Sequence, residues 1–474
     1  MNIPRGLWIC IAPAAVLILV LATHDPNPSV VRVDVAPAHA VAPPQAGAVA
    51  SEPAAAASAP AAAAGTPPTP LAVIQRAAKS YFPDMYNDAK YGLPDRFLPG
   101  ANPCWDWEWP GSGKGSHCLP SFLILGVYQS GVRDLYTRLS KHPGVAHRAA
   151  NSPSYYAQVK PDWPGYVREL DSSVEEAKAG KLLGEASAVT FHFVWVHQEK
   201  FNQPYVEAMG RFWKACNARS QAEKAALPHR ECMAARMADG READAEKARQ
   251  AGMPMAPDSG VARERTFSLP QLVRAAYGEA APHLIVLLRQ PWQRMHSAFY
   301  NYVHYRGKYG ATAAGEESWA RESVAAFRRC EGNFPTASCA LSFESLTRDN
   351  EETFYHCDQL IKGMYAVFLP RWRREFPGRV LPLRAEQYYK TPKVVLAKAM
   401  RFIGVAPPSD DAGWRPILSP SVAVAGTRPA GGAPPLAGPT RELLRQFYTP
   451  SLRELVTMLQ TEPDAAEWAA WSGV

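Results

Sequence analysis

The sequence predicts an α/β fold with a central parallel sheet covered on both faces by helices. Short, continuously apolar segments, of which HLIVLL at residues 283–288 is the clearest, alternate with longer segments of helical spacing. Continuous apolar strands are typical of parallel sheets that are buried on both faces, and the intervening helices supply the crossover connections. The chain has 474 residues and is 47% apolar, which is enough for a sizeable core.

The N-terminal segment at residues 6–22 is an uncharged apolar run of about 17 residues, preceded by Arg5. This length is at the lower limit for a helix that spans a bilayer. The preceding positive charge favours a cytosolic N-terminus and a translocated remainder, so we expect a cytosolic tip and signal anchor at 1–25. A signal peptide is the competing interpretation, because Val20 and Ala22 fit a small-residue cleavage rule. Both interpretations place the bulk of the chain in a secretory compartment.

Residues 26–70 are rich in alanine and proline and include AAAASAPAAAAGTPPTP. A segment of this composition buries little apolar surface, so we expect a disordered stem that holds a folded domain off the membrane. The folded domain is then predicted at 71–474. Within it, residues 212–250 carry a mixed Ala, Lys, Arg and Glu pattern, which predicts a solvated helical insertion near 207–265.

Strands and helices alternate in the rest of the predicted domain. We expect strands at 122–127, 283–288 and 379–383, and a strand end followed by a turn within 182–189. Helices are expected at 132–140 and 292–304. This order predicts that each buried strand is followed by a loop and a helix, the arrangement in which parallel sheets bind ligands.

Seven cysteines lie beyond the apolar run, in loose groups typical of disulfides in an oxidising compartment. Cys104 and Cys118 flank a loop rich in tryptophan and glycine and are the first expected pair, with Cys216 and Cys232 the second. The odd number means that at least one cysteine is unpaired or bonds between chains, and seven buried thiols are the alternative. No zinc-binding spacing is present, so we expect no metal.

The net charge of +7 suits an anionic partner. It is too small to indicate nucleic acid, and the chain has no nucleic-acid-binding motif, so we expect no nucleic-acid partner.

The turn after the first predicted strand, Tyr128-Gln129-Ser130-Gly131-Val132, precedes a predicted helix. Backbone N–H groups at a helix N-terminus favour an anion even without a side-chain cation. The hydroxyl of Ser130 adds a donor, and Arg133 in the first helical turn can fold back over the loop as an anion clamp. The turn is not a Walker A loop, because no Gly-Lys-Ser/Thr follows. A plain crossover between strand and helix is the alternative.

A second candidate is the segment LLRQPWQRMHSAFYNYVHY at residues 287–305. Arg289 ends the clearest strand, Pro291 opens a helix, and Ser297 follows about two turns later. An arginine at a strand end can form two hydrogen bonds to a phosphate, and the serine can add a third. The alternatives are an ion pair for Arg289 and a helix contact for Ser297.

Together, in this order and at this separation, the two elements resemble the 5′-phosphosulfate loop and the 3′-phosphate motif of sulfotransferases that use 3′-phosphoadenosine 5′-phosphosulfate (PAPS). The segments GEASAVT, GMYAVFLPRWRREFP, VLPLRAEQYYKTP and LLRQFYTPSLRELVTMLQ have counterparts in membrane-bound carbohydrate sulfotransferases. The resemblance covers most of residues 104–460 and is closest to the branch of N-acetylgalactosamine 4-sulfate 6-O-sulfotransferase.

The resemblance implies a P-loop-like three-layer sandwich that transfers a sulfuryl group from PAPS to a carbohydrate, such as a glycosaminoglycan. It also implies a single-pass type II protein of the Golgi membrane with a lumenal catalytic domain. The 5′-phosphosulfate would be held by the loop residues Gln129, Ser130, Gly131, Val132 and Arg133. The 3′-phosphate would be held by Arg289 and Ser297, with Arg428 in the late loop GTRPA as a third contact. A solvated loop arginine is the alternative for Arg428.

The sequence departs from the family pattern at both expected catalytic positions. Gln129 replaces the loop lysine, and Val132 and Arg133 replace two threonines. Ser152 stands where this branch has a glutamate, the expected base. Sulfuryl transfer develops negative charge on the leaving phosphate, which a fixed cation stabilises, and loss of a base typically costs roughly 10²–10⁴-fold.

Other residues can take these two roles. We expect Arg133 to supply the charge, and Glu185 or His192 to supply the base. A structural anchor is the alternative for Glu185, and a core or surface histidine for His192.

Three functions follow from these observations. The leading hypothesis is a lumenal sulfotransferase. The second is a sulfotransferase-like protein that binds nucleotide or glycan without turnover, because both catalytic positions are altered. The third is a nucleoside-phosphate kinase, which the missing P-loop lysine and Mg²⁺-binding Ser/Thr disfavour.

Overall fold

The computed structural model describes residues 69–109, 113–147, 155–157, 162–192, 267–332, 334–342, 357–419, 433–462 and 465–471, with three isolated helical positions between 193 and 266. The predicted anchor, nearly all of the predicted stem and almost all of the predicted insertion therefore lie outside the described residues. So do Ser152, Arg428 and the expected Cys216–Cys232 pair. No helix in the described ranges is long and apolar enough to cross a membrane.

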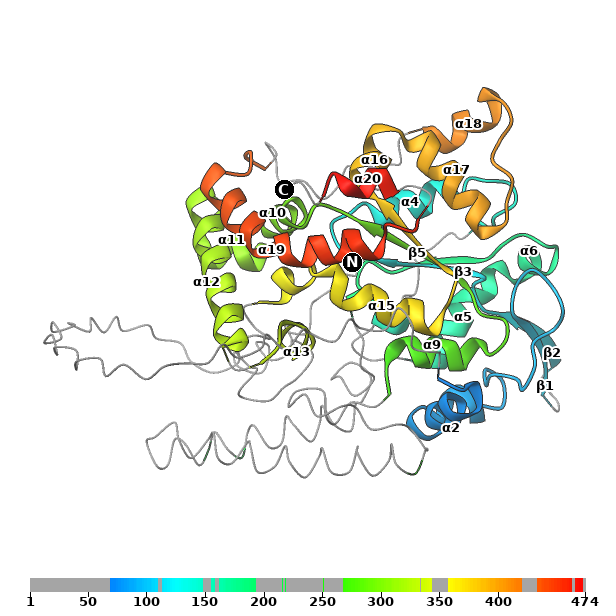
Figure 1. Cartoon of the computed structure of the whole chain (residues 1–474). Coiled ribbons are helices and arrows are strands. Elements are labelled where there is room, and N and C mark those ends of the chain that lie inside the picture. Colours follow the sequence, from blue (N-terminus) through cyan, green and yellow to red (C-terminus); the bar gives the residue numbers. More distant parts are fainter. Residues whose placement is uncertain are drawn as a thin grey trace, which may run out of the picture. The chain divides into compact units, whose positions relative to one another are not determined.

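A four-stranded parallel sheet lies at the centre of the described structure (Figure 1). Its order is β4 (Gly184–Ala186), β3 (Phe122–Gly126), β5 (His283–Leu288) and β6 (Val380–Arg384), and every neighbouring pair is parallel. The strands coincide with the four predicted segments to within a few residues. The prediction of a central parallel sheet is confirmed.

Successive residues of the strands pack into two separate cores, one on each face of the sheet. Leu123, Leu125, Leu284, Val286 and Leu288 belong to one buried cluster, and their neighbours Ile124, Ile285 and Leu287 belong to the other. Side chains alternate between the faces of a strand, so a strand buried on both faces is apolar throughout. This explains why the strands were readable as continuous apolar runs.

Helices supply the rest of both cores. The face of Leu123 is covered by α2 (Leu71–Tyr81), α9 (Leu269–Tyr277), α10 (Pro291–Asn301), α12 (Ala313–Glu331), α15 (Tyr365–Glu375) and α19 (Gly438–Met458). The face of Ile124 is covered by α4 (Val132–Leu139), α16 (Ala385–Lys390), α17 (Pro392–Ile403) and α18 (Asp411–Leu418). The predicted three-layer α/β arrangement is confirmed.

Shorter elements complete the described part of the chain. They are α3 (Pro83–Asn87), η1 (Tyr155–Ala157), α5 (Trp163–Leu170), η2 (Asp171–Ser173), α6 (Val174–Lys178), η3 (Thr190–His192), α11 (Val303–Tyr309), α13 (Thr336–Ser342) and α20 (Ala465–Ala469).

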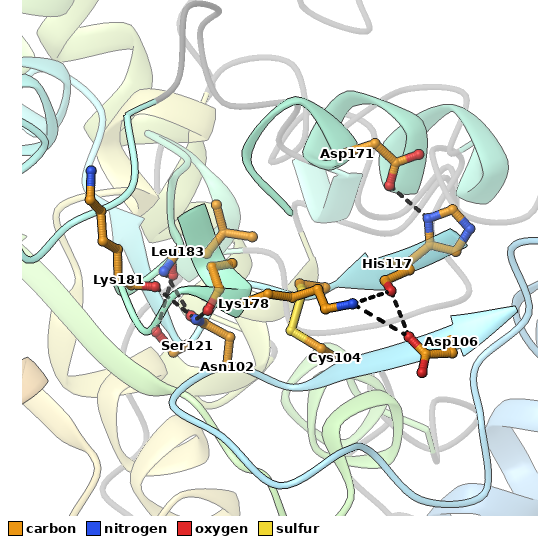
Figure 2. Close-up of a disulfide and its surroundings, with 12 residues drawn as sticks. Asn102, Cys104, Asp106, His117, Ser121, Asp171, Lys178, Lys181 and Leu183 are labelled. Atoms are coloured by element: carbon orange, nitrogen blue, oxygen red, sulfur yellow. Dashed lines mark hydrogen bonds and ion pairs between the residues drawn. A yellow bond between two sulfur atoms is a disulfide. The ribbon is translucent and has the colours of Figure 1, made fainter. Parts of the chain in front are cut away.

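The segment between Cys104 and Cys118 is a β-hairpin, where we expected a loop. β1 (Cys104–Trp109) pairs antiparallel with β2 (Gly113–Cys118), and the two cysteines are opposite each other and form the predicted disulfide. Just before β1, the side chain of Asn102 donates to the carbonyl of Lys181 at 2.8 Å and accepts from the N–H of Leu183 at 2.7 Å (Figure 2). These bonds attach the disulfide-closed hairpin to the segment that leads into β4.

A second disulfide joins Cys330 and Cys339 across the end of α12. Cys357 carries a buried thiol, whose Sγ donates to the carbonyl of Ser323 at 3.3 Å. The alternative of seven buried thiols is therefore wrong.

The helix predicted at 292–304 is two helices. α10 ends at Asn301, α11 begins at Val303, and Tyr302 between them is extended, with φ −82° and ψ 119°. The break coincides with tertiary contacts: the Tyr302 ring lies 5.3 Å from the ring of Tyr128, and Asn301 donates to the Tyr128 hydroxyl at 2.7 Å. These contacts turn the chain toward the loop that follows β3.

Candidate functional site

The loop at residues 127–131 joins the carboxyl end of β3 to α4, at the sheet edge where parallel folds bind ligands. Gln129 and Gly131 both have left-handed backbone conformations, with φ of 67° and 93°. The Val127 N–H donates to the carbonyl of Leu287 in β5 at 3.1 Å, which ties the loop to the neighbouring strand. Glycine adopts such a φ at no steric cost, so Gly131 allows the chain to turn sharply into the helix.

The N-terminus of α4 offers hydrogen-bond donors to an anion. The first N–H groups of an α-helix have no partner within it, and no side chain caps α4. The hydroxyl of Ser130 is completely buried and has no hydrogen-bond partner among the described residues. Backbone donors, the helix dipole and a buried hydroxyl together match a phosphate or a phosphosulfate.

Arg289 connects this loop to helix α10. It follows β5, and its Nη1 donates to the carbonyl of Gln129 at 2.7 Å and to the hydroxyl of Ser297 in α10 at 2.8 Å. The structure thus brings Gln129 together with Arg289 and Ser297, which lie about 160 residues later and which we had selected from a separate motif. A guanidinium held at a helix N-terminus adds the positive charge that an anion site needs.

Two residues that the sequence did not point to hold the turn after β5 in place. The hydroxyl of Tyr365 in α15 donates to the carbonyl of Arg289 at 2.6 Å. The carboxylate of Glu386 in α16 accepts from the N–H of Gln290 at 2.7 Å. Both come from elements about 75 to 100 residues away, so no local signal marks them.

The remaining loop residues predicted to hold the 5′-phosphosulfate have different surroundings. The side chain of Val132, the first residue of α4, is buried in the core, so only its backbone faces the loop. Arg133 is exposed on α4, and its guanidinium makes no hydrogen bond or ion pair among the described residues. Among the described residues, the cation that hydrogen-bonds to the loop is therefore Arg289.

Both residues predicted to act as the base are buried. Glu185 lies in β4 beside Leu123, is 3% exposed, and accepts a hydrogen bond from the Tyr166 hydroxyl at 2.6 Å. His192 is fully buried, and its ring packs against the rings of Phe191 and Phe368, each 5.2 Å away. A base must reach the acceptor hydroxyl, so this burial gives neither residue support, and both roles stay predictions.

The buried carboxylate of Glu185 lies among tyrosines. Burial raises the pKa of the Tyr166 hydroxyl well above its usual value, and the nearby Glu185 carboxylate raises it further. A neutral phenol that donates to a carboxylate is the stable pairing here, which agrees with the alternative of a structural anchor for Glu185. Within the described ranges, no three His, Cys, Asp or Glu side chains come close enough to hold a metal ion.

Known proteins give one consistent similarity. No family model matches the chain. Human carbohydrate sulfotransferase 15 is 23% identical over 412 residues, which cover 78% of this chain and 66% of the human protein. The mouse carbohydrate sulfotransferase 15 is 24% identical over 355 residues, covering 74% of this chain and 55% of the mouse protein. The chain thus spans between about half and two thirds of the length of these curated relatives.

A solved sulfotransferase from Alicyclobacillus acidocaldarius aligns with 74% of this chain and 99% of its own, at 15% identity and a TM-score of 0.36. This structural likeness is too low to carry an argument. The similarity to the curated relatives confirms the resemblance to carbohydrate sulfotransferases that the motifs indicated.

Proposed function

We propose that this chain transfers a sulfuryl group from PAPS to a carbohydrate hydroxyl. The observation that carries the proposal is the cluster at Arg289, whose Nη1 is 2.7 Å from the loop carbonyl of Gln129 and 2.8 Å from the hydroxyl of Ser297. The cluster places a strand-end cation, a helix hydroxyl and an uncapped helix N-terminus at one edge of the sheet. A nucleotide with phosphates at two positions needs two such anion sites next to each other.

The described residues fit the donor nucleotide. Its 5′-phosphosulfate would accept from the first N–H groups of α4 and from the buried hydroxyl of Ser130, which has no hydrogen-bond partner among the described residues. Its 3′-phosphate would bind Arg289 and Ser297, and Arg428 is proposed as the third contact. Donor binding at the carboxyl edge of a parallel sheet follows the general rule for such folds.

The chemistry requires a charge at the leaving group and a base at the acceptor. The acceptor oxygen forms a bond to sulfur, the bond from sulfur to the 5′-phosphate oxygen breaks with its electron pair, and the hydroxyl proton passes to a base. Negative charge grows on the departing phosphate, where fixed donors stabilise it most. We propose that Arg133 supplies the stabilising positive charge, since Gln129 offers only a neutral amide. Glu185 and His192 remain the proposed bases.

The acceptor and the location are part of the proposal. The names of the curated relatives support a carbohydrate acceptor. The apolar run at 6–22 supports a type II membrane protein with its large domain translocated, and the resemblance to membrane-bound carbohydrate sulfotransferases supports the Golgi lumen. Protease protection in sealed vesicles tests this placement, because digestion of the large domain from the cytosolic side without detergent would contradict it.

The alternative is a protein that binds the nucleotide or a glycan without turnover. Two observations favour it: position 129 carries no charge, and the Arg133 guanidinium makes no hydrogen bond to the loop among the described residues. The backbone donors of α4 and the contacts of Arg289 serve binding equally well in either case.

Incubation of the full-length chain with labelled PAPS and a panel of glycans separates these functions. The proposed enzyme forms labelled glycan and releases adenosine 3′,5′-bisphosphate. A binding protein retains nucleotide but transfers no label, and a kinase requires ATP with Mg²⁺. Absence of labelled product on every acceptor, beside normal bisphosphate binding, would overturn the enzyme proposal.

A further inference from the structure

Helix α16 is anchored to both parts of the proposed donor site. At one end, the carboxylate of Glu386 accepts from the N–H of Gln290 at 2.7 Å, in the turn between β5 and α10. Two residues later, the hydroxyl of Tyr388 donates to the carboxylate of Asp134 in the first turn of α4. That carboxylate also accepts from the Nε of Arg138 at 2.9 Å, which holds it in place.

Tyr389, the next residue, lies against the loop itself. A Cβ atom placed on Gly131 would be only 2.5 Å from the hydroxyl oxygen of Tyr389, and 3.2 Å from the carbon that bears it. Gly131 immediately precedes the first residue of α4. The hydroxyl of Tyr389 is therefore beside the N-terminus of α4, where the helix presents its unpaired N–H groups.

Tyr389 is exposed although its hydroxyl lies close to the loop. Its side chain is among the few large apolar ones that are exposed in the described structure, at 55%, whereas its neighbour Tyr388 is 1% exposed. A tyrosine that keeps its hydroxyl at a loop and its ring open to solvent is suited to a ligand that covers it from outside. Tyrosine serves this purpose well because one end is apolar and the other donates a hydrogen bond.

We propose that the hydroxyl of Tyr389 donates a hydrogen bond to the 5′-phosphate of the donor nucleotide. The inference rests on the proposed function, since it places a nucleotide phosphate at the N-terminus of α4. It adds a side-chain donor to a loop that has glutamine where sulfotransferases carry lysine. The hydrogen bonds of Glu386 and Tyr388 fix the position of the Tyr389 hydroxyl before the nucleotide binds, which lowers the entropic cost of the contact.

Nucleotides that differ only in the 5′-phosphate test this role. Calorimetry on the full-length chain measures the affinity of adenosine 3′,5′-bisphosphate and of adenosine 3′-monophosphate for wild type and Tyr389→Phe. A hydrogen bond to a charged group is worth enough to change affinity about 10-fold or more. We expect Tyr389→Phe to weaken the bisphosphate by this factor and to leave the monophosphate unchanged.

Tyr309→Phe is the matched control, because the hydroxyl of Tyr309 donates to Glu322 at 2.5 Å and takes no part in the site. It should bind both nucleotides like wild type. Equal bisphosphate affinity in wild type and Tyr389→Phe would reject the role of Tyr389 and leave the proposed function standing. Equal weakening of both nucleotides would assign Tyr389 to structure. Failure of wild type to bind the bisphosphate at all would instead reject the proposed nucleotide site, and the inference with it.

Discussion

Replacement of Arg289 by alanine is the perturbation whose effect follows most directly from the structure. The guanidinium donates to the Gln129 carbonyl at 2.7 Å and to the Ser297 hydroxyl at 2.8 Å. If it also contacts the 3′-phosphate, the variant loses a charge-assisted bond of about 1.5–3 kcal/mol. This free energy corresponds to a loss of roughly 10–150-fold in nucleotide affinity. Because the same guanidinium holds the loop against α10, we expect a value toward the upper end of this range.

Calorimetry with adenosine 3′,5′-bisphosphate measures this loss. Arg379→Ala is a matched control, because the Nη1 of Arg379 also donates to a backbone carbonyl, that of Ala281 at 2.8 Å, but precedes β6 at the opposite edge of the sheet. The control should bind like wild type. Equal affinity in wild type and Arg289→Ala, with an unchanged melting temperature, would refute the reasoning and give Arg289 a purely structural role.

Three further predictions concern the loop, the hairpin and the buried tyrosines. Arg133→Ala should lower kcat/KM far more than Gln129→Ala, and Gln129→Lys should be neutral or mildly activating. The reason is that only a cation stabilises the negative charge that grows on the departing phosphate in the transition state. Transfer rates that do not respond to Arg133→Ala would contradict this account of the loop. Reduction of the Cys104–Cys118 disulfide should lower the free energy of unfolding by about 3 kcal/mol, as denaturant titration of the Cys104→Ala, Cys118→Ala double variant measures. Burial raises the pKa of several tyrosines, that of Tyr300 to about 12. Because the folded state keeps these hydroxyls protonated, their contribution to the free energy of unfolding should be fully present below pH 10 and should fall as the pH rises above 10. A free energy of unfolding, measured by denaturant titration, that stays constant between pH 10 and pH 12 would contradict this.

The sheet was predictable from the sequence because its strands are buried on both faces. Such strands must be apolar at every position, and residues 283–288 show this directly. Arg289 and Ser297 could be selected from the sequence because Arg289 follows a clear strand end and Ser297 lies in the helix that Pro291 opens, but the direct hydrogen bond between them was not predicted. The hairpin at β1 and β2 was missed, although Trp105, Trp107 and Trp109 alternate with charged residues in the period of a strand.

The rest of the site depends on tertiary contacts that leave no local pattern. Tyr302 interrupts a segment of helical spacing because it packs against Tyr128, about 170 residues earlier. Tyr365 and Tyr389 reach the site from helices that follow it by about 75 residues or more. Glu185 lies in a segment predicted to end a strand, but only the register with β3 reveals that it points into the core.

Sulfate ester formation tests the central proposal most directly. The full-length chain is mixed with labelled PAPS and a carbohydrate acceptor, and two products are followed in time: labelled carbohydrate and free adenosine 3′,5′-bisphosphate. The proposed transfer predicts that both appear at equal rates and that Arg289→Ala slows them together, while Arg379→Ala does not. Bisphosphate binding of normal strength, with no labelled ester on any acceptor, would contradict the proposal and identify the chain as a nucleotide-binding protein without turnover.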